Sequence, residues 1–147
     1  MMFDIRPAMG KFFDKCFAFP IRVYYEDTDA GGIVYYANYL RFAERARTEF
    51  IRQLGCSQQE GLEACQKCGF TVRNCQIDYK APAVLDDALV VTCVLQSVKG
   101  ATVDMVQNIY RGDTLLVSLS VKLAYVDLER KRPVRIPAEL VSKLSNL

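Results

Sequence analysis

The chain has 147 residues, of which 51% are hydrophobic, and its formal net charge is +2. These values predict one globular domain, and so small a charge gives no support to nucleic-acid binding. The sequence contains no histidine, which excludes Ser-His-Asp and Cys-His catalysis and His-ligated metals, so acid–base chemistry must come from Asp, Glu, Lys, Tyr or Cys.

Residues 1–18 show no hydrophobic period and are expected to form an irregular extension. Charged side chains interrupt them, so no apolar segment typical of a secretory signal is present: Asp4, Arg6, Lys11, Asp14 and Lys15. No stretch is long and apolar enough for a membrane span. The six cysteines are therefore interpreted as reduced, buried thiols of a cytoplasmic protein. The single pair Cys65 and Cys68 lacks a second pair or a histidine, so no metal site is expected.

The first strand is predicted at residues 19–25, which end in a run of β-branched and aromatic side chains. The next segment, EDTDAGGIVYYAN at residues 26–38, places three carboxylates and two glycines between this strand and a helix. Acidic residues at such a point are either turn formers and caps or a catalytic carboxylate beside a helix N-terminus. The pattern by itself leaves both interpretations open.

A long helix is predicted at residues 39–54, where apolar side chains recur at helical spacing. Asn38 is expected as its N-cap and Gly55 as its C-terminal stop. Two small side chains, Ala43 and Ala46, predict that a sheet approaches this helix closely. Opposite charges one turn apart add minor support, at Arg45 and Glu49.

A second, shorter helix is predicted from the capping box formed by Ser57 and Glu60, ending near Gly69. The hydrophobic period then changes to two, which predicts strands at residues 70–80, 89–99, 102–110 and 115–125, the first with a bulge near Arg73 and Asn74. Short Gly-containing connections predict antiparallel neighbours. We expect Pro133 and Pro137 to end the sheet and residues 138–144 to form a last short helix.

These elements predict an α+β fold in which an antiparallel sheet of about five strands wraps one long central helix. A helix with a broad apolar face needs such cover, and a strongly twisted sheet provides it. No repeat, linker or low-complexity tract divides the chain. Residues 19–147 are therefore expected to form one domain.

The segment VYYEDTDAGGIVYYANY at residues 23–39, followed by ERARTE at residues 44–49, closely resembles the 4-hydroxybenzoyl-CoA thioesterase family of hotdog-fold proteins. Within that family it is most similar to bacterial acyl-CoA thioesterases associated with the Tol–Pal system. The resemblance continues through residues 78–87 and 126–127, so it covers roughly residues 19–137 and its motif is long and specific.

The resemblance implies a catalytic role for two residues. The second Asp of the family's D-x-D pair falls on Asp29, and the backbone N–H that polarises the thioester carbonyl falls on Tyr36. Many members of the Tol–Pal branch carry His at this second position, whereas the 4-hydroxybenzoyl-CoA branch carries an aromatic residue. The resemblance thus implies an acyl-CoA thioesterase that requires no metal and no cofactor, with coenzyme A entering as part of the substrate.

The physical chemistry agrees with this implication. A thioester is hydrolysed either by direct carboxylate attack, through a mixed anhydride, or by a water that the carboxylate deprotonates. Both routes need an ionised carboxylate and a donor for the oxyanion, and a helix N-terminus supplies free N–H groups. Asp27 is expected to be a structural partner of Asp29. Glu44 is the rival catalytic carboxylate, although its position is more typical of an ion pair. Tyr35 and Tyr39 are expected in the core.

Several alternatives and partners follow from the same resemblance. The thioester is carried either by CoA or by acyl carrier protein, and Lys131 and Arg132 either contact CoA phosphates or lie in solvent. By resemblance the protein is a homodimer with sites at the subunit interface, assembling further into a homotetramer. The rival in another class is a hotdog scaffold that binds acyl carrier protein or a cell-envelope partner without turnover. A hotdog hydratase would use an Asp and His pair, which this chain lacks.

Overall fold

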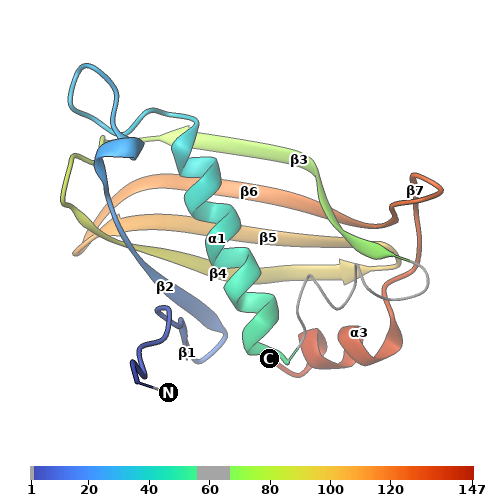
Figure 1. Ribbon diagram of the computed structural model, residues 1–147. Helices are drawn as coiled ribbons and strands as arrows, with labels where there is room; N and C mark the ends of the chain where they lie inside the picture. The colour runs from blue at the N-terminus through green and yellow to red at the C-terminus, as the bar shows by residue number, and fades with distance from the viewer. Residues whose placement is uncertain (1, 56–66) are drawn as a thin grey trace.

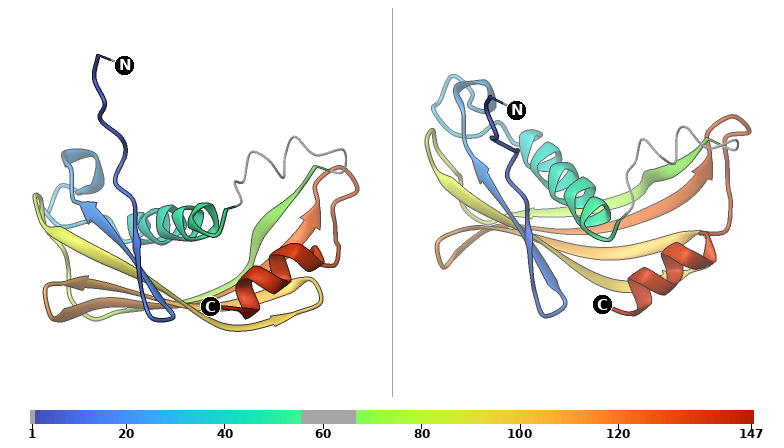
Figure 2. Two further views of the ribbon diagram at one scale, coloured as in Figure 1. Left: turned by 90° about the horizontal axis from the view of Figure 1, so that it is seen from below. Right: turned by 60° about the horizontal axis from the view of Figure 1, so that its bottom comes forward.

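The structure is a computed structural model that describes residues 2–55 and 67–147. In these residues one curved antiparallel sheet holds helix α1 (Asn38–Gln53) across its concave side, and the short helix α3 (Ala138–Ser145) lies on the same side (Figures 1 and 2). The N-terminal segment projects away from the sheet (Figure 2). The predicted second helix and its capping box at Ser57 and Glu60 lie outside the described residues.

The sheet has seven strands in the described part of the chain, with the order β1-β2-β4-β5-β6-β3 and β7 paired to β6. Five of them are long, as predicted, and two short ones are added. The strands are β1 (Lys11–Phe13), β2 (Cys16–Arg22), β3 (Cys68–Tyr79), β4 (Ala88–Lys99), β5 (Thr102–Arg111), β6 (Thr114–Asp127) and β7 (Arg132–Pro133). The predicted bulge is confirmed, because the register of β3 against β6 shifts between Val72 and Asn74.

The core lies between the concave face of the sheet and the apolar stripe of α1. Four α1 side chains are fully buried, Phe42, Ala43, Ala46 and Phe50, and the alternating residues of β4, β5 and β6 meet them, as the period of two predicts. The small alanines allow this close approach. The helix ends as predicted, since Gly55 has a φ of +90°, a left-handed conformation that glycine adopts without a steric penalty.

The N-terminal expectation needs correction. Residues 11–13 and 16–18 are not irregular, because they belong to β1 and β2, and the first predicted strand starts at Cys16 and ends at Arg22. Phe17 is fully buried in this region. No hydrophobic period is visible in so short a hairpin, so the pattern gave no strand signal there.

Two smaller expectations also change. Ala37, not Asn38, is the N-cap of α1; Asn38 is its first residue. Glu49 pairs with Arg52 instead of Arg45. Pro133 is the last residue of β7, where the described sheet ends as predicted, and it pairs with Val126 at the sheet edge, where proline is tolerated. The predicted last helix is confirmed as α3.

Candidate active site

The acidic segment after β2 folds into a small hairpin that precedes α1 (Figure 1). After the 3-10 turn η1 (Tyr25–Asp27), residues 27–29 run antiparallel to residues 33–35. Two backbone hydrogen bonds close the arms, from Asp29 N to Ile33 O at 2.9 Å and from Tyr35 N to Asp27 O at 2.9 Å. The hairpin therefore fixes Asp29 beside its tip and delivers the chain to α1.

The tip explains the glycine pair. Gly32 N donates to Asp29 O at 3.0 Å, and Gly32 has a φ of +83°, which favours glycine. The Asp29 side chain takes part, since its Oδ1 accepts a hydrogen bond from Gly31 N at 2.8 Å. Within residues 2–55 and 67–147 the other oxygen, Oδ2, has no hydrogen bond or ion pair, and the residue is exposed. Asp29 is thus a turn former that keeps one oxygen available.

Asp27 has a different role from Asp29. It is buried, its Oδ2 accepts a hydrogen bond from Tyr24 N at 2.8 Å, and its carbonyl accepts one from Asn38 Nδ2 at 2.8 Å. The Asn38 side chain is therefore used to tie the hairpin to α1, which is why it does not cap the helix. Asp27 holds the loop together, as its predicted structural role requires.

The N-terminus of α1 carries free donors. Its N-cap, Ala37, makes no side-chain hydrogen bond, and its first turn contains no acidic residue. The backbone N–H of Tyr36, just before the N-cap, has no acceptor in the described chain. Such a terminus combines unsatisfied N–H groups with the positive end of the helix dipole, so it favours a developing negative charge.

Tyrosines surround this helix end. The ring of Tyr36 lies 5.0 Å from that of Tyr35 and 6.1 Å from that of Tyr79, and Tyr79 OH donates to Tyr36 O at 3.1 Å. Tyr39 is buried in the core as predicted, but Tyr35 is 46% exposed, so the prediction that it belongs to the core is wrong. Sequence reasoning missed Tyr79, whose position at the end of β3 gave no functional signal.

The rival carboxylate, Glu44, lies about 10 Å further along α1, given a rise of 1.5 Å per residue from Ala37. It is exposed and makes no ion pair among the described residues, so the expected pairing is not found. Glu44 lines a cleft of about 300 Å³ between the second half of α1 and strands β3, β5 and β6, together with Arg47, Phe50, Phe70, Met105 and Leu123. The cleft is mainly apolar, and Arg47 Nη1 donates there to the buried Gln107 Oε1 at 2.9 Å.

Two other sets of candidates lie away from the hairpin. Lys131 and Arg132 are exposed at β7, at the end of the sheet opposite the hairpin (Figure 1). Within one chain they do not adjoin Asp29. Among residues 2–55 and 67–147 no three Cys, Asp or Glu side chains are grouped as metal ligands, and Cys65 lies outside these ranges.

The described cysteines are less uniformly buried than predicted. Cys68 and Cys93 are buried, whereas Cys16 and Cys75 are half-buried. Cys93 is fully enclosed, and Gln107 Nε2 approaches its Sγ at 3.2 Å. Burial raises the pKa of Cys93 to about 12.

We expect Cys93 to resist alkylation in the folded protein. At a pH near 8.5, the ordinary pKa of a thiol, a group with a pKa of about 12 is almost wholly protonated, and only the thiolate reacts. After denaturation its pKa returns to the ordinary value, so labelling should rise at least tenfold. Peptide mass spectrometry after iodoacetamide treatment with and without urea measures this. Equal labelling in both states would show that Cys93 is not enclosed.

Comparison with known proteins identifies the class. A family model described as "Thioesterase-like superfamily" matches residues 23–144. A solved structure of a 4-hydroxybenzoyl-CoA thioesterase variant, in complex with 4-hydroxybenzoyl-CoA, superposes with a TM-score of 0.82 at 19% identity and covers 89% of this chain and 99% of its own, which shows a common fold. The chain therefore belongs to the thioesterase-like superfamily of hotdog proteins, and the predicted fold is confirmed.

Relatives of higher identity carry a named activity. The chain is 48% identical over 134 residues to the acyl-CoA thioesterase YbgC of Haemophilus influenzae, covering 91% of this chain and 98% of that protein. It is 41% identical over 128 residues to the acyl-CoA thioester hydrolase YbgC of Escherichia coli O157:H7, covering 86% and 94%. In class the protein is thus a thioester hydrolase. None of the helices in the described ranges has the length and apolarity needed to cross a membrane.

Proposed function

We propose that the protein hydrolyses acyl-CoA thioesters, with Asp29 as the catalytic carboxylate and the backbone N–H of Tyr36 as the oxyanion donor. The observation that carries this is the hairpin before α1. Among the described residues it presents an exposed carboxylate whose Oδ2 has no partner and, seven residues later, a backbone N–H without an acceptor at the N-terminus of α1. The relatives named acyl-CoA thioesterases support the substrate class.

Two routes use these groups. In the first, Asp29 Oδ2 bonds to the thioester carbon, the C–S bond breaks, the CoA thiolate leaves, and water hydrolyses the resulting anhydride to free acid and Asp29. In the second, Asp29 takes a proton from water as the water attacks, and passes it to the leaving thiolate. In both, the carbonyl oxygen becomes negative, and one aligned N–H is worth about 3 kcal/mol to that transition state.

The test is release of free thiol from a panel of acyl-CoAs of different chain length, with aromatic acyl groups and acyl carrier protein thioesters included. Turnover of at least one substrate is expected. The alternative is a scaffold that binds acyl carrier protein or a cell-envelope partner, in keeping with the Tol–Pal branch that the motif resembles. Binding of the carrier protein without thiol release from any thioester would favour that alternative.

We further propose that the protein is a homodimer whose subunits meet along β3. This strand is at an edge of the sheet and pairs with β6 alone among the described strands. Val72 and Tyr79 on it are 50% and 42% exposed. An open strand of twelve residues invites pairing with another chain. Tyr79 contacts Tyr36, so pairing along β3 would bring the partner close to the candidate site. Sedimentation at micromolar concentration should give a dimer or tetramer mass.

The Tyr36 side chain should contribute little to turnover. If the backbone N–H polarises the carbonyl, Tyr36→Phe keeps that donor and the ring contacts with Tyr35 and Tyr79. We expect kcat within about threefold of wild type, measured by steady-state thiol release, with Tyr35→Phe as the matched control. A loss of a hundredfold or more in Tyr36→Phe alone would assign the chemistry to the hydroxyl.

A further inference from the structure

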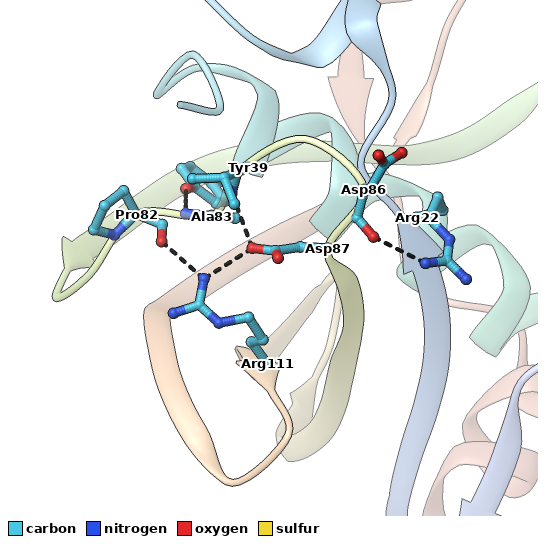
Figure 3. A network of polar contacts seen from close by, with 8 residues as sticks. Arg22, Tyr39, Pro82, Ala83, Asp86, Asp87 and Arg111 are labelled. Atoms are coloured by element: carbon cyan, nitrogen blue, oxygen red, sulfur yellow. Dashed lines mark hydrogen bonds and ion pairs between the residues drawn. The ribbon is translucent and has the colours of Figure 1, made fainter. Parts of the chain in front are cut away.

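A partly buried charge pair lies near the candidate site and joins the loop between β3 and β4 to the end of β5 (Figure 3). Asp87 Oδ2 accepts two hydrogen bonds, from Val84 N at 2.9 Å and from Arg111 Nη1 at 2.8 Å. The Asp87 side chain is only 16% exposed. Arg111, at the end of β5, also donates to Pro82 O at 3.2 Å. Asp87 and Arg111 therefore hold the segment 82–84 by hydrogen bonds at both of its ends.

The segment 82–84 contacts both parts of the candidate site, the hairpin that carries Asp29 and the first turn of α1. Ala83, fully buried at its centre, donates its N–H to Tyr39 OH on the first turn of α1 at 2.9 Å, and its carbonyl accepts from Val34 N at 2.9 Å. Val84 forms an isolated β-bridge with Ile33, the residue whose carbonyl receives the N–H of Asp29. The segment 82–84 therefore contacts both the hairpin that contains Asp29 and the start of α1, which follows Tyr36.

The same loop is also fixed to the strand that enters the hairpin. Asp86 N donates to Val23 O and Val23 N donates to Asp87 O, both at 3.0 Å, and Arg22 Nη1 donates to Asp86 O at 2.8 Å (Figure 3). Burial acts to raise the pKa of Asp87, but the hydrogen bonds from Val84 and Arg111 outweigh it, so the pKa lies below its usual value and the group stays ionised. Charge-assisted bonds of this kind hold a loop more firmly than neutral ones.

We propose that Asp87 and Arg111 are positioning residues that set the geometry between Asp29 and the N-terminus of α1, an inference that rests on the proposed function. Neither needs to touch the substrate in this role. Displacement of a reacting group by about 1 Å can lower a rate by about a hundredfold. Loss of the pair should therefore lower kcat, while KM, which reports binding, changes much less.

The test uses full-length Asp87→Asn, Arg111→Gln, Arg111→Lys and the double variant Asp87→Asn with Arg111→Gln. We expect kcat to fall about tenfold or more in Asp87→Asn and Arg111→Gln with KM within about threefold, and the double variant to be no worse than the singles, since they break one unit. Arg111→Lys should recover part of the rate because it restores the charge. The matched control is Asp104→Asn, which breaks the 2.9 Å pair with Lys122 between β5 and β6 and should leave kcat within twofold.

A second readout does not depend on turnover. Hydrogen exchange of the peptide covering residues 28–36 should become faster in Asp87→Asn and Arg111→Gln, and not in Asp104→Asn. Folded variants with wild-type kcat and unchanged exchange would overturn the proposal, as would a fall in thermal stability without any change in kcat. If Asp87→Asn fails to fold, the variants of Arg111, whose side chain is half-exposed, test the proposal instead. A wild type that hydrolyses no thioester would contradict the proposed function. Hydrogen exchange of residues 28–36 would then decide whether Asp87 and Arg111 hold the hairpin in place.

Discussion

Replacing Asp29 by Asn should lower kcat by about a hundredfold or more while KM changes little. The structure makes this substitution unusually selective. The turn uses only Oδ1, which accepts from Gly31 N at 2.8 Å, and the amide oxygen of Asn can accept the same bond. Gly32, at a φ of +83°, keeps the tip in place. The change therefore removes the charge and basicity of Oδ2 and leaves the hairpin intact.

The measurement is steady-state thiol release after circular dichroism and sedimentation confirm folding and assembly. Asp27→Asn is the matched control two residues away, and it should cost much less because its carboxylate is buried and accepts a hydrogen bond from Tyr24 N. Glu44→Gln tests the rival at the apolar cleft. Wild-type turnover in Asp29→Asn with an inactive Glu44→Gln would move the catalytic carboxylate onto α1.

The central elements were predictable because their patterns are long. Over sixteen residues the stripe of α1 separates buried from exposed positions, and in β6 the burial alternates from Val117 to Leu123, so periodicity indicates both the element type and the inward face. The bulge in β3 was visible as a slip of phase near Arg73. Helix and sheet together then leave little choice of fold, since each needs the other to bury its apolar face.

The parts that depend on long-range contacts were not predictable in this way. Asn38 reads locally as a cap, but its amide is recruited by the carbonyl of Asp27, eleven residues away. Asp87 and Arg111 are 24 residues apart and show no local pattern, although together they hold the loop behind the site. The candidate positions Asp29 and Tyr36 came from the resemblance of residues 23–39, whereas the residues proposed to support them came only from the structure.

Truncation of Phe17 tests the correction at the N-terminus, and we expect Phe17→Ala to lower the free energy of unfolding by about 3–5 kcal/mol. Phe17 is fully buried, and its ring lies 5.1 Å from that of Phe12 and 5.9 Å from that of Phe50 on α1. Gly10 covers the ring so closely that a Cβ there would come within 2.1 Å of it. The hairpin of β1 and β2 therefore closes one end of the core.

The matched control is Phe13→Ala in the same hairpin. Phe13 is 60% exposed, so its truncation creates no buried cavity and should lower the free energy of unfolding by less than about 1 kcal/mol. Urea unfolding followed by circular dichroism, at one protein concentration for all variants, compares the two because an oligomer's stability depends on concentration. Equal small losses in both variants would mean that residues 11–18 do not pack on α1 in solution. A large loss confined to Phe17→Ala would establish that the core begins before the first strand that periodicity reveals.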